Sequence, residues 1–510
     1  MFKRLLCGIA PFALMIAAPA CAQPAASTAD APITPADMMR HIEQLASDAF
    51  GGRAPGSASE PLTTTYISQQ LAARGAEPAG DNGTWLQEVR LVERIPGRAT
   101  TRWTARGRAV EIASTELVLM GKEGNEAIAN APVIFAGHGV RMPDRGIDQL
   151  AGANFQGAVA LILLQGPQIP GFPSLAERMR TLSEAGAVGV IAIVDAGVPF
   201  PAVAATFGRG TTRLDTIPVP RVVGAMPIAA AQRLIAAAGG NLERLLNDQP
   251  GASFRSVALP ITASLDVTTS VRRYVSNNVV GRIRGSGATN ESLLYLAHWD
   301  HFGTCRPEGT PDRICNGAVD NASGVAMMLE VAGRLGRQPR PPRDILFLAT
   351  TSEEQGLLGA DFFATHPVVP AASIVAAINM DTVAIHPAGE PVAVMGRGRP
   401  ALDRVIDATV REMGRRLDGD DEAEAFVQRQ DGYRLQLAGI PSIMVGGSFS
   451  NMALLEVFLS GDYHKPADQL GRPIPLDGAA EDANLLVALG RRLADPAVYQ
   501  RTAPVTPAAN

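Results

Sequence analysis

The chain has 510 residues, which is too long for one ordinary domain, so we expect two or three domains. Hydrophobic residues make up 46% of the sequence, which is ample for buried cores. The formal net charge of −5 gives no basic surface and argues against nucleic acid as a partner.

The N-terminus is typical of an export signal. Lys3 and Arg4 precede an apolar segment at residues 5–18, and Ala20-Cys21-Ala22 offers small residues for cleavage. We therefore predict a signal peptide at residues 1–22 and a mature protein in the periplasm or outside the cell. Two alternatives stay open: a membrane anchor, and a lipoprotein acylated at Cys21, for which the preceding residues are a poor match. No later segment is apolar enough to span a bilayer.

Two of the four cysteines, Cys305 and Cys315, would remain in the mature chain, ten positions apart. In an oxidising compartment such a pair most simply forms a disulfide. Closing so short a loop contributes about 2–3 kcal/mol in the chain-entropy model. Metal binding by the pair is the weaker alternative, because no C-x-x-C spacing accompanies it.

The first part of the main domain is expected at residues 35–113, after a flexible leader at residues 23–34 that is rich in Ala, Pro, Ser and Thr. The apolar spacing predicts two helices with a turn-rich break between them, followed by two strands. The helices are predicted at residues 35–47 and 61–74, the break at 50–56, and the strands at 85–93 and 101–112.

The sequence changes in character at residues 114–265, which we predict to be a separate, β-rich inserted domain. Short β runs alternate with Gly/Pro turns there, and the segment has no dense cluster of His, Asp and Glu. A recognition or lid role is expected for it. Strands are predicted at residues 116–120, 132–135, 158–164 and 188–194, and helices at 175–185 and 228–238.

Residues 266–497 alternate between strand and helix patterns and are predicted to form the main part of the domain. This alternation is typical of a mixed α/β fold, with a mostly parallel sheet flanked by helices. A Pro/Ala-rich tail at residues 498–510 is expected to be disordered. Strands are predicted at residues 279–284, 293–297, 344–349, 374–379, 391–395 and 442–445. Helices are predicted at residues 321–335, 356–365, 401–413, 433–438 and 478–493.

Acidic residues and imidazoles gather just beyond these predicted strands. Each one alone has an ordinary explanation as a turn, cap or surface residue. Their recurrence at successive strand ends indicates a metal site, and oxygen and nitrogen ligands without thiolate suit zinc, manganese or cobalt. The residues concerned are His298, Asp300, Asp320, Glu353, Glu354, Asp381 and His464.

Five motifs carry a resemblance to a known family and occur in that family's order. They are Ala297-His298-Trp299-Asp300-His301, the segment 318–324 (AVDNASG), the segment 351–359 (TSEEQGLLG), Asn379-Met380-Asp381 and the segment 463–468 (YHKPAD). The sequence resembles the di-zinc exopeptidases that include secreted leucyl aminopeptidases, aminopeptidase Y and the glutamate carboxypeptidase II group. The inserted segment 114–265 resembles a protease-associated domain.

The resemblance implies two zinc ions that share Asp320 as a bridging carboxylate, with manganese or cobalt as possible substitutes. His298 and Asp381 would complete one site, and Glu354 and His464 the other. Glu353 is the implied general base. The implied activity is an aminopeptidase acting on peptides with a free N-terminus.

Other residues near these motifs receive supporting roles. Asp300 and Asp468 are candidates for orienting His298 and His464 through their second ring nitrogens. The family often carries Ser-Asp-His where this chain has Gln430-Asp431-Gly432, so the usual histidine is missing; the next residue, Tyr433, is a candidate donor to the oxyanion. His301 is predicted to be structural and not a ligand.

Two further functions remain open at this stage. The same metal site supports a carboxypeptidase of the glutamate carboxypeptidase II type, for which basic residues should converge on the pocket. A catalytically inactive binding protein on the same fold would have broken ligands or a missing base. Because every implied ligand and Glu353 are present, the sequence favours an enzyme. The oligomeric state is not determined by the sequence.

Overall fold

The computed structural model describes residues 31–167, 169, 172–248 and 253–502. The predicted signal peptide, most of the leader and the last part of the predicted tail lie outside the described residues. Within the described ranges, none of the helices is both long enough and apolar enough to cross a bilayer.

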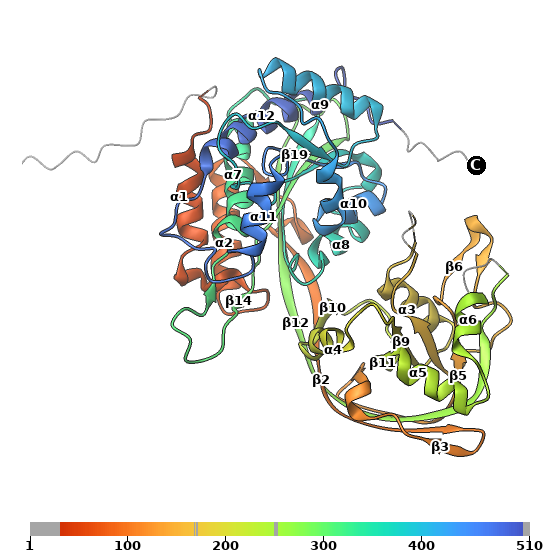
Figure 1. Ribbon diagram of the computed structural model, residues 1–510. Helices are drawn as coiled ribbons and strands as arrows, with labels where there is room; N and C mark the ends of the chain where they lie inside the picture. The colour runs from red at the N-terminus through yellow and green to blue at the C-terminus, as the bar shows by residue number, and fades with distance from the viewer. Residues whose placement is uncertain (1–30, 168, 170–171, 249–252, 503–510) are drawn as a thin grey trace, which may run out of the picture.

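Two lobes are joined by a pair of long strands (Figure 1). β2 (Leu86–Ala105) and β12 (Val257–Ile283) run antiparallel along almost their whole length and pass from the larger lobe into the smaller one. The prediction of two separate strands at 85–93 and 101–112 is wrong. A register shift between Val267 and Thr269 on β12 accommodates Pro96 within one continuous strand.

The larger lobe contains a mostly parallel sheet in the order β18-β19-β17-β13-β16-β12. The central strands β13, β16, β17 and β19 are parallel to one another, whereas β18 and β12 are antiparallel to their neighbours. The mixed α/β fold is therefore confirmed. The bounds are β13 (Ser292–His298), β16 (Asp344–Thr350), β17 (Ile374–Asn379), β18 (Ala393–Met395) and β19 (Ser442–Gly446).

Helices cover both faces of this sheet. The larger apolar core packs α1, α2, α7, α9 and α12 against one face, and a second core packs α8 and α10 against the other. α1 begins at a capping box between Thr34 and Asp37, which satisfies its first free N–H groups. The bounds are α1 (Pro35–Leu45), α2 (Glu60–Ala73), α7 (Gly324–Gly336), α8 (Leu358–Thr365), α9 (Pro400–Glu412), α10 (Gly432–Leu437) and α12 (Leu476–Leu493).

One helix of the larger lobe was not predicted. α11 (Met452–Ser460) is apolar on most sides, and among its residues Leu455 is the buried one. Because the segment lacks a polar face, its sequence has no 3.6-residue period that would predict a helix.

The smaller lobe builds its own two apolar cores around the parallel strands β8, β9 and β11. The predicted boundary at residues 265/266 falls inside β12, which continues through both lobes. The identity of this lobe as a protease-associated domain stays a prediction. Its elements include β4 (Val118–Gly121), β5 (Asn125–Phe135), β8 (Val159–Leu163), β9 (Gly189–Val194), β10 (Thr211–Leu214), β11 (Val222–Pro227), α3 (Leu175–Glu184), α4 (Phe200–Gly208), α5 (Ile228–Ala237) and α6 (Leu242–Asp248).

Candidate metal centre

The carboxyl ends of three neighbouring parallel strands deliver the predicted site residues. β13 ends at His298, the Glu353–Glu354 pair follows β16, and Asp381 follows β17. Because β13 pairs with both β16 and β17, these three strand ends meet at one edge of the sheet. The structure therefore brings together side chains that are separated by more than eighty positions in the sequence.

Asp320 lies between two histidines. Its Oδ1 is 3.3 Å from Nε2 of His298, and its Oδ2 is 3.3 Å from Nε2 of His464. The same nitrogen of His298 lies 3.4 Å from Oδ1 of Asp381. One carboxylate thus faces both halves of the cluster, which is the placement that a bridging ligand needs.

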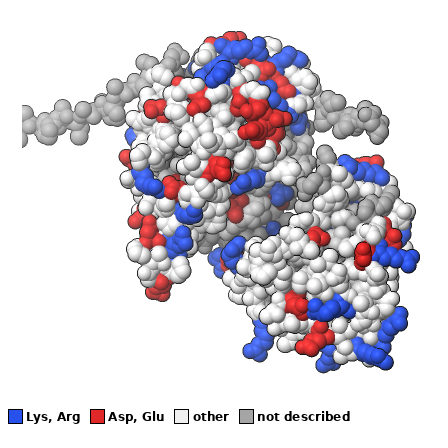
Figure 2. All heavy atoms as spheres, in the orientation of Figure 1, with Lys and Arg blue, Asp and Glu red and all other residues white. Residues whose placement is uncertain are grey.

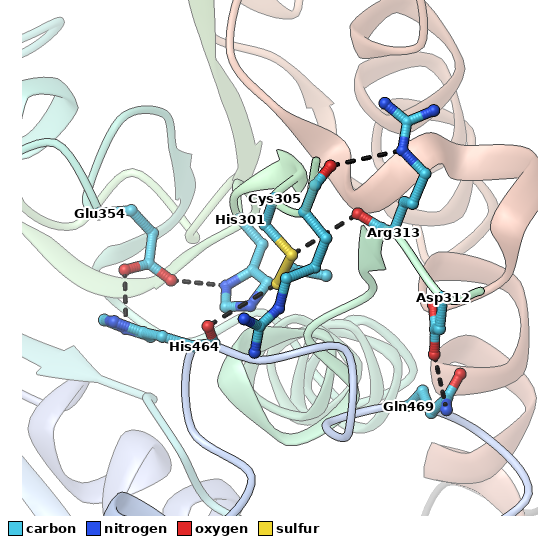
Figure 3. Close-up of a disulfide and its surroundings, with 9 residues drawn as sticks. His301, Cys305, Asp312, Arg313, Glu354, His464 and Gln469 are labelled. Carbon is cyan, nitrogen blue, oxygen red and sulfur yellow. Dashed lines mark hydrogen bonds and ion pairs between the residues drawn. A yellow bond between two sulfur atoms is a disulfide. The ribbon is translucent and has the colours of Figure 1, made fainter. Parts of the chain in front are cut away.

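Glu354 is held by two imidazoles (Figure 3). Its Oε1 is 2.5 Å from Nδ1 of His301, and its Oε2 is 3.0 Å from Nε2 of His464. Burial alone would raise the pKa of Glu354, but the two histidines outweigh it and lower that pKa. His301 therefore fixes the orientation of Glu354 through one oxygen, while the other oxygen faces His464.

Glu353 and Asp300 are linked at the base of the site. The backbone N–H of Glu353 donates to Oδ1 of Asp300 at 3.1 Å, and the same oxygen lies 3.9 Å from Nδ1 of His298. Burial raises the pKa of Asp300 to about 8 and raises the pKa of Glu353 well above its usual range. A carboxyl group with a raised pKa is suited to accepting a proton near neutral pH.

Asp468 has a different partner from the one that was predicted. Its Oδ1 accepts from the backbone N–H of Val319 at 2.8 Å, and its Oδ2 accepts from the N–H of Asp320 at 3.0 Å. Asp468 therefore holds the backbone of the loop that carries Asp320, whereas the prediction had it orienting the ring of His464.

A disulfide joins Cys305 and Cys315, as predicted. It closes a loop whose strands β14 (Gly303–Thr304) and β15 (Ile314–Cys315) pair with each other. The loop contacts the segment around His464 at two points (Figure 3): Sγ of Cys315 lies 3.7 Å from the carbonyl oxygen of His464, and Gln469 donates to Asp312 at 3.1 Å. The disulfide loop thus supports the segment that presents His464.

A small cavity of about 40 Å³ opens onto the cluster, and the tyrosine that lines it is Tyr463. Tyr433, the predicted candidate, is half-buried on α10 and is not among the residues that line this cavity. Tyr463 directly precedes His464, so its place in the motif was the signal that could have identified it. The lining comprises Asp320, Glu353, Asp381, Thr382, Met395, Phe426, Arg429, Gln430, Phe449, Leu455, Leu459 and Tyr463.

Left-handed backbone conformations concentrate around the cluster. Ser352, Leu357, Thr382 and His464 all have positive φ, between 52° and 63°. Each such non-glycine residue costs about 1–3 kcal/mol, so the surrounding packing must hold these loops in place. Strained backbone conformations of this kind are typical of functional sites.

The donor set fits a divalent cation. Two groups, one of His298, Glu353 and Asp381 and one of His301, Asp320 and Glu354, each place one ligand atom per residue within 4.8 Å of the others. In the described part of the chain, Nε2 of His464 is buried without a hydrogen bond even though two carboxylates lie close to it. Imidazole and carboxylate donors without thiolate suit zinc and related metals.

Strand ends that present imidazoles and carboxylates in this way are typical of metallohydrolases. Residues 278–488 match the family model described as Peptidase family M28. This part of the larger lobe, which carries all the predicted ligands, is therefore similar in sequence to that peptidase family.

Parts of the chain are also similar to curated proteases. Over 98 residues the chain is 37% identical to a vacuolar membrane protease of Clavispora lusitaniae, covering 19% of this chain and 9% of that protein. Over 255 residues it is 25% identical to a probable zinc metalloprotease of Leptosphaeria maculans, covering 48% and 55%. The chain thus matches about a tenth of the length of the first and about half of the second.

The fold is similar to that of a solved aminopeptidase from Aneurinibacillus sp. strain AM-1. The TM-score is 0.51 at 18% sequence identity, and the alignment covers 94% of this chain and 97% of that one. At this identity the similarity establishes the shared fold of the two chains.

Proposed function

We propose that this chain is an exported aminopeptidase that holds two zinc ions and releases N-terminal residues from peptides. The observation that carries the proposal is the position of Asp320, whose two oxygens each lie 3.3 Å from a different histidine. The match to Peptidase family M28 and the aminopeptidase-like fold support it.

The proposed ligands are those implied by the sequence motifs. His298 and Asp381 would hold one ion, Glu354 and His464 the other, and Asp320 both. Bound zinc would supply Lewis acidity for the scissile carbonyl and lower the pKa of water toward ~7. Manganese or cobalt would fit the same donors.

Glu353 is the proposed general base. It lines the cavity together with Asp320 and Asp381, and burial raises its pKa. In this role its carboxylate takes a proton from the attacking water and passes it to the amine that leaves. Asp300 holds the backbone N–H of Glu353 and faces His298, so it acts by positioning both groups.

The walls of the cavity support a preference for an apolar N-terminal side chain. Phe426, Phe449, Leu455 and Leu459 line it together with Met395. On the upper part of the larger lobe, a cluster of acidic side chains lies next to basic ones (Figure 2).

The proposal is tested by an activity screen of the purified protein on aminoacyl reporters with apolar and charged residues, with and without a chelator. Hydrolysis of unblocked apolar reporters, lost on chelation and restored by zinc, is the expected result. Metal analysis on the same sample should report two zinc ions per chain. Absence of hydrolysis in a preparation with two bound zinc ions would favour a binding protein on this fold.

Arg429 is the observation that favours a second candidate, a carboxypeptidase. It is the basic residue in the cavity lining, and its guanidinium lies 5.4 Å from the centroid of the Phe426 ring. A substrate carboxylate could pair with it. Rates on amine-blocked and carboxyl-blocked dipeptides separate the two activities: an aminopeptidase cleaves only the carboxyl-blocked one.

A further inference from the structure

Arg53 is a cation buried beside the candidate metal centre. It lies at the end of the turn-rich segment Asp48–Arg53, far in sequence from every predicted ligand, and its side chain is fully buried. Burying a guanidinium costs free energy unless every N–H is satisfied and opposite charge lies near. The contacts of Arg53 show how this chain meets both conditions.

All the hydrogen bonds of the Arg53 side chain go to backbone carbonyl groups. Nε donates to Trp299 at 2.7 Å; Nη1 donates to Asn316 at 2.6 Å and to Leu45 at 2.8 Å; Nη2 donates to Gly317 at 2.8 Å. Trp299 stands between His298 and Asp300, and Gly317 is three residues before Asp320. One guanidinium therefore joins the strand end that presents His298 to the loop that presents Asp320.

The main chain at Gly52 and Arg53 also packs against the segments that follow His298 and precede Asp320. The carbonyl oxygen of Arg53 accepts from the N–H of His301 at 3.3 Å. Gly52 has a positive φ of 67°, and a Cβ there would lie only 2.4 Å from the carbonyl oxygen of Cys315. Glycine is required at this approach, and it lets Arg53 reach beneath the cluster.

The charges around Arg53 are those of the candidate centre. Burial lowers the pKa of Arg53 to about 10, and the carboxylates of Asp468, Asp300, Asp320 and Glu354 act in the opposite direction. Since each of these four residues is a predicted ligand or contacts one, the guanidinium offsets part of the negative charge that the centre gathers.

We propose that Arg53 is a positioning residue of the metal centre: it clamps the His298 strand end to the Asp320 loop and serves as a fixed counter-charge for the buried carboxylates. This inference rests on the proposed metal centre. It also assigns a task to the N-terminal part of the larger lobe, which contributes none of the predicted ligands.

The control must separate this role from ordinary stabilisation by a buried arginine. Arg343, at the start of β16, is equally buried, and its Nη1 donates to the backbone carbonyl groups of Leu493 at 2.8 Å and Tyr499 at 2.7 Å. Arg343 lies at the opposite end of β16 from Glu353. Arg343 also pairs with the carboxylate of Glu291 at 2.7 Å. The variants Arg53→Lys and Arg343→Lys therefore each weaken the bonds of a buried arginine to backbone carbonyl groups, one at the centre and one away from it, and Arg343→Lys also perturbs an ion pair.

The experiment measures zinc affinity of the full-length chain by competition with a chromophoric chelator, together with thermal unfolding and kcat and KM on an aminoacyl reporter. For Arg53→Lys we expect zinc affinity to fall on the order of 10-fold to 100-fold, with kcat lowered and KM within about threefold of the unsubstituted protein. Arg343→Lys should lower the melting temperature while leaving zinc affinity and kcat unchanged.

Unaltered zinc affinity in Arg53→Lys would overturn the inference, and so would an equal loss of affinity in Arg343→Lys. Arg53→Gln, which removes the charge as well, should lose more affinity than Arg53→Lys. The zinc titration does not depend on any peptidase activity, so failure of the proposed function and failure of this inference give different results.

Discussion

The Sγ of Cys315 lies 3.7 Å from the carbonyl oxygen of His464, which places the disulfide directly beneath a predicted zinc ligand. His464 has a positive φ of 57°, so its backbone conformation depends on the packing around it. The disulfide loop and the segment 463–468 therefore form one structural unit although about 150 residues separate them.

Replacing Cys305 and Cys315 together by Ser tests this unit. The chain-entropy model predicts a loss of about 2–3 kcal/mol for a loop of this length. We also expect zinc to bind more weakly at the His464 side, because the loop no longer supports that residue. Denaturant unfolding and zinc titration measure the two effects. Unchanged zinc affinity would show that the loop stabilises the fold but does not position His464.

Glu353→Gln tests the general base. The amide keeps the shape of the side chain but takes up no proton, so kcat should fall on the order of 10²-fold to 10⁴-fold while zinc stoichiometry stays unchanged. Glu354→Gln is the matched control, because the neighbouring residue is a proposed ligand; that variant should lose zinc. Near-normal turnover of Glu353→Gln would assign the base to another group.

Zinc should stabilise the folded chain. Asp300, Asp320 and Asp468 are all buried in or beside the cluster, and burial together with the charge of Asp320 raises the pKa of Asp468 to about 6, so a bound cation would offset the cost of these buried carboxylates. At a zinc concentration a thousandfold above the dissociation constant, linkage predicts about 4 kcal/mol of added stability. Calorimetry with and without chelator measures this added stability. In Asp320→Asn, zinc should add much less stability than in the unsubstituted protein.

Tyr463→Phe tests the hydroxyl group in the cavity. Tyr463 stacks on His464 with ring centroids 3.5 Å apart and lines the cavity with Glu353, so we expect its hydroxyl group, and not that of Tyr433, to donate to a developing oxyanion. We expect kcat to fall on the order of tenfold or more, with KM little changed. Tyr433→Phe, outside the cavity lining, should behave like the unsubstituted protein. If Tyr433→Phe lowers kcat and Tyr463→Phe does not, Tyr433 is the donor, as the sequence predicted.

Glu330→Gln tests a buried charge network away from the centre. Oε1 of Glu330 pairs with Arg74 at 2.6 Å and with His41 at 3.0 Å. Burial alone would raise the pKa of Glu330, but the bond from His41 and the charge of Arg74 lower it from 4.5 to about 2. That lowering corresponds to roughly 3 kcal/mol of folding free energy.

The sign follows from the depressed pKa in the folded state. The stabilisation is complete above pH 4.5 and is lost as the pH falls toward 2. The difference in unfolding free energy between the unsubstituted protein and Glu330→Gln should therefore be constant from pH 5 to 7 and shrink below pH 4.5. If the difference in unfolding free energy does not vary with pH, the ionised network does not contribute to the stability of the fold.

Local sequence pattern predicted much of the larger lobe. Strands such as β13 and β17 are continuous apolar runs, and helices such as α7 and α12 have regular apolar spacing, so each carries its own signal. Where the pattern and the structure differ, the cause is tertiary. β2 continues through Pro96 because β12 shifts register opposite it, and α11 is helical without an amphipathic sequence.

The sequence by itself determined the residue types of the candidate centre and their positions at strand ends, because parallel strands end at a common edge and the motifs are short and local. Only the tertiary structure decided which atoms meet. Asp468 bonds to the backbone of Asp320 and not to His464, Tyr463 replaces Tyr433 in the cavity, and Arg53 lies beneath the cluster. These contacts join residues that are distant in the chain, and the backbone path between them is set by packing of the whole lobe, which no local pattern encodes.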